Sequence, residues 1–461
     1  QARAALLAEC DGYFCRCSVL GASAALGVRR CFAMRVELAH FGEFTAAPRK
    51  WAGGVLGLDG YVYGVPRDAD SVLRIDPRTR TCQSFGSVGQ ERRKWIWGVR
   101  APDGRIFCVP CNAPAVLCID APRGTCYTFG NLGLETEKWS AGILGPDGKI
   151  YCVPWSARAV LVIDPSNDRC STIGSLPFGG KKWACGEIGR DGCIYCPPCD
   201  APSILRICPS QGLATEIPLW PHMSPAELQV CDKYVGCAAG PDGRIFAVPC
   251  CARSVLVISP TTDVSGVDLK VWGSLGSAEW KWTCALLAAN GRIYGVPNCA
   301  DRVLCIDPAR ETVDVFGESV IAFAAQANRW DSGVLALDGG IYCLPCEAES
   351  VLCIDTNSDT CRVHRLGLES ATSDKWLDAV ICSDMQTIVG VPYSAKSVLL
   401  AKVQAREAML VELVLMFSLV EWPTDVEAPF PRLARGKVCA REPEGPMAQL
   451  QRLLARLDPA M

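Results

Sequence analysis

The chain has 461 residues, of which 49% are hydrophobic and 21% are charged, and its net charge is -3. This composition is typical of a folded globular protein and excludes a predominantly disordered chain. The near-neutral charge gives no general basic field, so nucleic acid is not an expected partner. No segment has the roughly 18 uninterrupted apolar residues that a membrane-spanning helix needs.

Residues 1–33 show no clear period and are expected to form an N-terminal extension. The chain starts at Gln1 rather than Met, which suggests a fragment or a processed form. Of its 29 cysteines, several occupy repeat positions that hold small residues in other copies of the repeat. Examples are Cys108, Cys152, Cys196 and Cys343, which align with Gly64, Ala247, Gly295 and Gly390. This pattern is typical of cysteine as a small buried hydrophobe and favours a reducing, intracellular and cytoplasmic location.

Residues 34–403 carry eight copies of one repeat, each marked by a basic residue followed by an aromatic anchor. The basic residues are Lys50, Lys94, Lys138, Lys182, Lys233, Lys281, Arg329 and Lys375. The anchors that follow them lie 44 to 51 residues apart. An acidic or amide residue comes eight positions after each anchor. A fixed period of this length predicts a repeat architecture.

The first repeat divides into four short strands. We expect strands at 52–58, 61–65, 71–75 and 81–85. An Asp59-Gly60 turn joins the first two strands, and Asp76-Pro77 opens the turn before the last. Asp-Gly between apolar runs is a strong hairpin signal, and Asp-Pro favours a turn. Four strands in each unit predict an all-β fold, a β-propeller with eight four-stranded blades.

The two ends of the repeat region supply the last blade. Repeat 8 offers three strands, which end near Lys402. The segment from Val36 to Gly42 precedes Trp51 by the spacing of a fourth strand, so we expect an N-terminal strand to close the ring. A rival fourth strand is 411–417. Because repeat 8 is degenerate, seven blades with a stray unit is the alternative.

Residues 404–461 are expected to form a tail with helical segments. After Pro446, Met447, Leu450 and Leu454 fall on one helical face. The stretch 422–446 is rich in proline and is interpreted as a linker. We expect the terminal helix to pack on its own chain, with a partner surface as the other possibility.

The repeated runs resemble those of known propeller families. In the first repeat they read DGYVYGVP at 59–66 and SVLRIDP at 71–77. These runs resemble NHL-repeat and Kelch-like proteins, gluconolactonase-like enzymes and virginiamycin B lyases, over roughly residues 36–402. The resemblance implies the fold. A gluconolactonase-like activity would imply a channel cation, whereas a lyase would imply a catalytic histidine. The histidines are His40, His222 and His364, and none falls on a first strand.

The basic residues before the anchors form the main candidate binding set. The connections into the first strand and between the second and third strands share one rim of a propeller blade. We therefore expect the eight basic side chains to form a ring near the channel mouth, which would attract an anionic ligand or an acidic peptide. The structural alternative is that each lysine covers its anchor. Loop residues Arg67, Trp155, Cys199 and Tyr393 are expected to set specificity.

A second candidate set lies on the inner strands, which line the channel. Its polar members are Glu187, Asp331, Asp378 and Arg100. Three carboxylates from different blades could contribute to a calcium site, although separate solvated carboxylates are the favoured interpretation. The Cys-x-x-Cys pairs at 108–111, 196–199 and 343–346 belong to different blades, so a structural role is favoured over a metal site. We assign no catalytic residue, metal ligand or cofactor.

The sequence therefore favours a non-catalytic, cysteine-rich interaction or scaffold module that binds a protein or an anionic ligand on one rim. The alternative is a lactonase- or lyase-like enzyme with a divalent metal, such as calcium, in the central channel.

Overall fold

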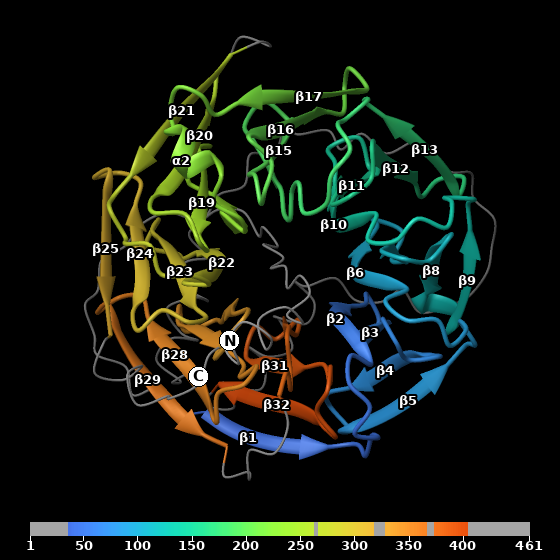
Figure 1. The fold of residues 1–461 in the computed structure, drawn as a ribbon. Helices are drawn as coiled ribbons and strands as arrows, with labels where there is room; N and C mark the ends of the chain where they lie inside the picture. Colours follow the sequence, from blue (N-terminus) through green and yellow to red (C-terminus); the bar gives the residue numbers. More distant parts are fainter. Residues whose placement is uncertain (1–35, 262–265, 318–327, 367–372, 404–461) are drawn as a thin grey trace, which may run out of the picture. The chain divides into compact units, whose positions relative to one another are not determined.

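The computed structural model describes residues 36–261, 266–317, 328–366 and 373–403. In this part of the chain, eight four-stranded antiparallel sheets follow one another around a ring (Figure 1). The chain is an eight-bladed β-propeller, as the repeat period predicts, and the seven-bladed alternative is wrong. No helix of the described residues is long and apolar enough to cross a membrane.

Each of the first seven blades takes its four strands from consecutive sequence, ordered from the channel outwards. Blades 1 and 2 contain β2 (Trp51–Leu56), β3 (Val62–Pro66), β4 (Val72–Asp76), β5 (Thr81–Phe85), β6 (Trp95–Arg100), β7 (Ile106–Pro110), β8 (Val116–Asp120) and β9 (Thr125–Phe129). Blades 3 and 4 contain β10 (Trp139–Leu144), β11 (Ile150–Pro154), β12 (Val160–Asp164), β13 (Arg169–Ile173), β14 (Glu187–Ile188), β15 (Ile194–Cys196), β16 (Ser203–Cys208) and β17 (Leu213–Pro218).

The remaining blades follow the same order. Blades 5 and 6 contain β18 (Tyr234–Ala239), β19 (Ile245–Pro249), β20 (Val255–Pro260), β21 (Val267–Trp272), β22 (Trp282–Leu287), β23 (Ile293–Pro297), β24 (Val303–Asp307) and β25 (Thr312–Phe316). Blades 7 and 8 contain β26 (Val334–Leu335), β27 (Ile341–Cys343), β28 (Ser350–Asp355), β29 (Thr360–Arg365), β30 (Ala379–Ile381), β31 (Thr387–Gly390) and β32 (Val398–Val403). A 3-10 turn, η1 (Ala121–Arg123), and a short helix, α2 (Pro225–Leu228), lie in connections.

Blade 8 is closed by an N-terminal strand, as predicted. Strand β1 (Val36–Phe41) pairs antiparallel with β32, with Val36 opposite Val403 and Phe41 opposite Val398 (Figure 1). The outermost strand of the last blade thus comes from the start of the ring, so the seam has no unpaired edge on β32. The rival strand at 411–417 and the predicted extensions at 1–33 and 404–461 lie outside the described residues.

The residues that recur in every repeat make the hydrogen bonds that hold each blade together. The Trp51 indole N–H donates to the Ser71 carbonyl over 2.9 Å and so ties the first strand to the start of the third. Asp59 accepts the Tyr61 amide over 3.2 Å and the Tyr63 hydroxyl over 2.7 Å, which stabilises the turn at Gly60. Equivalent bonds recur around the ring. The recurrent anchors and acids therefore build the fold.

Neighbouring blades are in close contact at the first strand. A Cβ at Gly54 would lie 2.6 Å from Cγ2 of Val380 and from Cγ2 of Val391, both in blade 8. A side chain there would overlap the preceding blade, and the same holds at Gly98 and Gly142. At Gly186 the nearest atom is Cys196 Sγ of the same blade, so crowding there also comes from within the blade.

Candidate interaction rim

The direction of the strands defines two faces of the ring. Because successive strands are antiparallel, the connections between blades and those between second and third strands lie on one face. In blade 1 these segments are 86–94 and 67–71. We call this face the loop rim. The opposite face, the turn rim, carries the short turns 57–61 and 77–80.

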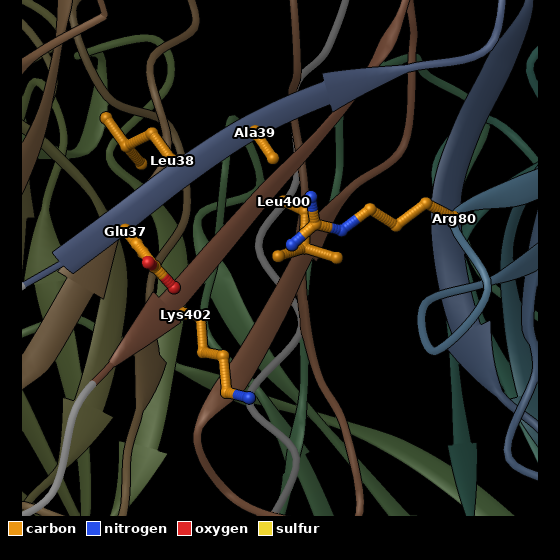
Figure 2. Close-up of a pocket in the computed structure, with 6 residues that line it drawn as sticks. All are labelled: Glu37, Leu38, Ala39, Arg80, Leu400 and Lys402. Carbon is orange, nitrogen blue, oxygen red and sulfur yellow. The ribbon is translucent and has the colours of Figure 1, made fainter.

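A small pocket lies on the turn-rim side of the outer wall, where blade 8 meets blade 1 (Figure 2). It is lined by Glu37, Leu38, Ala39, Arg80, Leu400 and Lys402. Arg80 extends from blade 1 towards β1 and β32. The pocket lies away from the channel mouth, and none of its lining residues belongs to either set of predicted site residues.

The eight basic residues of the predicted ring are buried, with at most 6% of each exposed. Their long side chains bridge backbone carbonyl groups. Lys94 Nζ donates to the Glu91 oxygen over 2.8 Å and, in blade 1, to the Ala69 oxygen over 2.9 Å. Lys281 Nζ makes the same kind of bridge to Ala278 and, in blade 5, to Ala252, over 2.7 and 2.8 Å. These contacts hold adjacent blades together.

Burial also changes the proton affinity of these lysines. Desolvation lowers the pKa of Lys50 and of Lys182 to about 8. Lys94, Lys138 and Lys233 have pKa values lowered for the same reason. Binding of an anionic ligand by this ring stays a prediction. In the structure its charges lie beneath other residues of the rim.

The residue just before each of these basic positions is half-buried and reaches the surface. These residues, which we call the mouth ring, are Arg49, Arg93, Glu137, Lys181, Asp232, Trp280, Asn328 and Asp374. All eight have a φ between 50° and 59°. The left-handed conformation is costly for non-glycine residues and persists only where the surroundings hold it. Its recurrence in every blade shows that the same backbone turn precedes each first strand.

Several positions of the mouth ring are held by the preceding blade. The Arg93 amide donates to Asp68 Oδ1 over 2.6 Å, and the Glu137 amide donates to Asn112 Oδ1 over 2.8 Å. Side chains also pair along the ring, as Arg93 and Glu137 do over 2.8 Å. The backbone is thus the same in each blade while the side chain differs. Sequence reasoning missed this ring because its members share no residue type.

Three exposed apolar side chains, which we call the apolar arc, lie in connections on the same rim. Leu134 is 84% exposed, Phe178 is 86% exposed and Trp220 is 60% exposed. They lie in three consecutive connections between blades, from blade 2 to blade 5. Large apolar side chains exposed on one rim make this rim a candidate contact surface for another protein.

The predicted specificity residues lie deeper. Arg67, Trp155, Cys199 and Tyr393 are at most 6% exposed. Trp155, Cys199 and Tyr393 belong to one apolar cluster that also contains Ile96 and residues of several other blades. Side chains therefore pack tightly beneath the mouth ring, and the partly exposed ring lies above them.

The polar residues of the inner strands have different hydrogen-bond partners. Glu187 is 4% exposed, its Oε2 has no hydrogen-bond partner, and burial raises its pKa to about 8. Asp331 accepts from Asn298 over 3.2 Å, and burial raises its pKa to about 7. Asp378 accepts the Gly54 amide over 3.1 Å. Arg100 donates to the Leu56 carbonyl over 2.6 Å.

These channel carboxylates do not assemble into one donor group. Within the described ranges, three potential metal-binding side chains come within 4.8 Å of one another at Cys199, Asp200 and Asp232, and that group excludes Glu187, Asp331 and Asp378. A channel calcium ion stays a prediction of the enzyme alternative. Sequence reasoning missed the group that does converge.

The fold and its repeats define the class, a β-propeller that resembles the virginiamycin B lyase-like propellers. A streptogramin B lyase structure is similar over 80% of this chain and 98% of its own, with 14% identity and a TM-score of 0.52. A catalytically inactive virginiamycin B lyase from Staphylococcus aureus with quinupristin is similar over 80% and 99%, with 12% identity and a TM-score of 0.50. No family model matches the chain. No curated protein matches it either.

The histidines of this chain lie apart from the inner strands. His40 is on β1 and His364 is on β29, the outermost strands of blades 8 and 7. His222 lies in the connection between β17 and α2. The similarity to lyases is therefore a similarity of fold.

Proposed function

We propose that this chain is a non-catalytic β-propeller that binds a partner protein on the loop rim. The observation that carries the proposal is the apolar arc of Leu134, Phe178 and Trp220, three exposed side chains in consecutive inter-blade connections. Rigid apolar anchors contribute most of the binding energy at protein interfaces, and aromatic residues are prominent among them.

The mouth ring supplies the polar edge of this surface. Glu137, Lys181 and Asp232 lie in the same three connections as the apolar arc and bring charges of both signs. A polar rim around apolar anchors is the usual anatomy of an interface. The partner is thus expected to present an apolar patch bordered by charged residues. Beyond the arc, the half-buried Arg49 favours an acidic side chain of the partner at blade 1.

The enzyme alternative rests on fold similarity, which says little about activity. An imidazole base would have to act near the channel, whereas the three histidines lie on outer strands or in a connection. This placement favours the interaction function.

The proposal is tested by differential capture with three forms of the full chain. The first is the natural sequence and the second carries Leu134→Ser, Phe178→Ser and Trp220→Ser. The third carries Leu58→Ser, a matched control because Leu58 is 64% exposed on the turn rim. Each form is immobilised on a support and incubated with an extract of the source cells. The retained proteins are then quantified by mass spectrometry.

A partner of the loop rim is retained by the natural sequence and by the control, and is lost from the triple variant. Because each anchor is expected to contribute about 1 kcal/mol or more, the triple variant should bind at least about a hundredfold more weakly. Identical retained proteins on all three forms, or turnover of a small substrate without any partner, would contradict the proposal.

A further inference from the structure

Two Cys-Asp dipeptides meet at the junction of blades 4 and 5. Cys199 and Asp200 follow β15 of blade 4, whereas Cys231 and Asp232 immediately precede Lys233 and β18 of blade 5. The Cys199 thiol donates to Asp232 Oδ1 over 3.3 Å. Ligand atoms of Cys199, Asp200 and Asp232 all lie within 4.8 Å of one another.

The surface end of the junction is marked by Cys231, which directly precedes Asp232 in the chain. Cys231 is exposed, whereas Cys199 is fully buried. The junction therefore has a buried end and an open end, and an ion could reach it from solvent.

The surroundings leave the donors incompletely neutralised. Lys181 Nζ lies 3.4 Å from both carboxylate oxygens of Asp232, and its side chain is 42% exposed. Asp200 Oδ1 accepts the Asp232 backbone amide over 2.7 Å, which places the two residues side by side. Two carboxylates and a buried thiol thus share a small volume, with the lysines Lys181 and Lys233 near them, and a divalent ion bound between the three donors would stabilise this arrangement.

We propose that Cys199, Asp200 and Asp232 form a binding site for a divalent transition-metal ion, most suitably Zn²⁺, that bridges blades 4 and 5. The site does not depend on the proposed docking of a partner protein. It is separate from the channel carboxylates and from the Cys-x-x-Cys pairing, since Cys196 is not one of its ligands.

The donor set suits zinc. Thiolate and carboxylate are both zinc ligands, with bond lengths of about 2.3 and 2.1 Å, so four tetrahedral ligands lie roughly 3.5 Å apart. The 3.3 Å between Cys199 Sγ and Asp232 Oδ1 already matches that spacing. Thiolates disfavour the hard cations calcium and magnesium. On binding, each ligating thiol releases its proton to solvent, so affinity should rise with pH.

Among the described residues, the other junctions lack this convergence and provide controls. Cys111 occupies the position of Cys199 in blade 2, is also buried, and is followed by Asn112 instead of an aspartate. At the junction of blades 7 and 8, the Cys346 thiol lies 3.6 Å from Asp374 Oδ1, but these residues form no three-donor group of the kind found at Cys199. One zinc site is therefore expected in the propeller.

The test uses the full chain after removal of metals with a chelator, with Zn²⁺ alone as the probe. Calorimetric titration measures stoichiometry and affinity, and addition of Co²⁺ reports thiolate ligation through its charge-transfer absorption. The variants are Cys199→Ser and Asp232→Asn, and the control is Cys111→Ser. Circular dichroism confirms that each form is folded. Unfolding temperature is recorded with and without Zn²⁺.

The natural sequence and the control should bind one Zn²⁺ per chain with affinity in the micromolar range or tighter, and Zn²⁺ should raise their unfolding temperature. Each variant should bind at least about tenfold more weakly, since a metal ligand is lost, and Cys199→Ser should lose thiolate-to-cobalt absorption. Failure of the natural sequence to bind Zn²⁺ saturably would overturn the proposal. Equal binding by both variants and the control would overturn it as well.

Discussion

Lys94 in blade 2 places its ammonium nitrogen 2.9 Å from the backbone carbonyl oxygen of Ala69 in blade 1. The side chain therefore crosses the boundary between two blades and is 2% exposed. Lys281 and Lys375 make equivalent bonds to the preceding blade. The basic residue of the repeat thus acts as a connector between sheets that share no strand.

Replacing this connector should destabilise the propeller. Lys94→Met removes the donor and leaves the carbonyl groups of Ala69 and Glu91 without their ammonium partner, which should lower the free energy of unfolding by about 1–3 kcal/mol. Denaturant unfolding measures the change. Arg92→Met is the matched control, because Arg92 is exposed in the same loop. Equal stability of the two variants would refute the structural role of Lys94.

The contact between Gly53 and Trp97 should be sensitive to a single methyl group. A Cβ at Gly53 would lie 2.4 Å from Cε3 of Trp97, and Gly53 has a φ of +83°. Gly60 has a φ of +81° but open space around its Cβ position. Gly60→Ala should therefore cost about 1–2 kcal/mol from backbone strain, whereas Gly53→Ala should cost roughly a further 1–3 kcal/mol from overpacking. Thermal unfolding of both variants separates the two effects.

Glu187 should make stability depend on pH. Burial raises its pKa to about 8, from an ordinary value of 4.5, so the folded state holds this proton between those values and the unfolded state does not. Stability should then fall as pH rises from 5 to about 8, and the raised pKa of Asp331 adds to the same trend up to about 7.

Glu187→Gln should flatten that dependence. At pH 8 the variant should be more stable than the natural sequence by about 1–3 kcal/mol, because it removes a buried charge, and the difference should shrink towards pH 5. Unfolding temperature measured across this pH range checks the prediction. Parallel profiles for the two proteins would show that the carboxyl group of Glu187 does not titrate in this window.

Strand β1 should be needed for closure of the ring. A chain that lacks residues 1–42 leaves the β32 edge unpaired, so it should unfold at a lower denaturant concentration and aggregate. A chain that lacks residues 1–34 retains β1 and is the control. Light scattering and denaturant unfolding of the two truncated forms measure the effect. The same stability and solubility in both would mean that β1 is dispensable.

The sequence by itself determined the architecture. The recurring pair at Lys94-Trp95, the Asp-Gly turns and the spacing of Val36 to Gly42 before Trp51 led to eight blades and to the closing strand. These features can be recognised in the sequence because strand period and turn chemistry are local, and because the same pattern recurs in each repeat.

Only the tertiary structure decided which residues face solvent and which donors meet. Lys94 and Arg93 are neighbours in sequence, yet the left-handed backbone at Arg93 turns its side chain outward while Lys94 is buried. Cys199 and Asp232 meet across a blade junction through a connection whose length departs from the period. Such placements depend on how sheets pack against one another, because a repeat pattern specifies each sheet but not the atoms that converge between two of them.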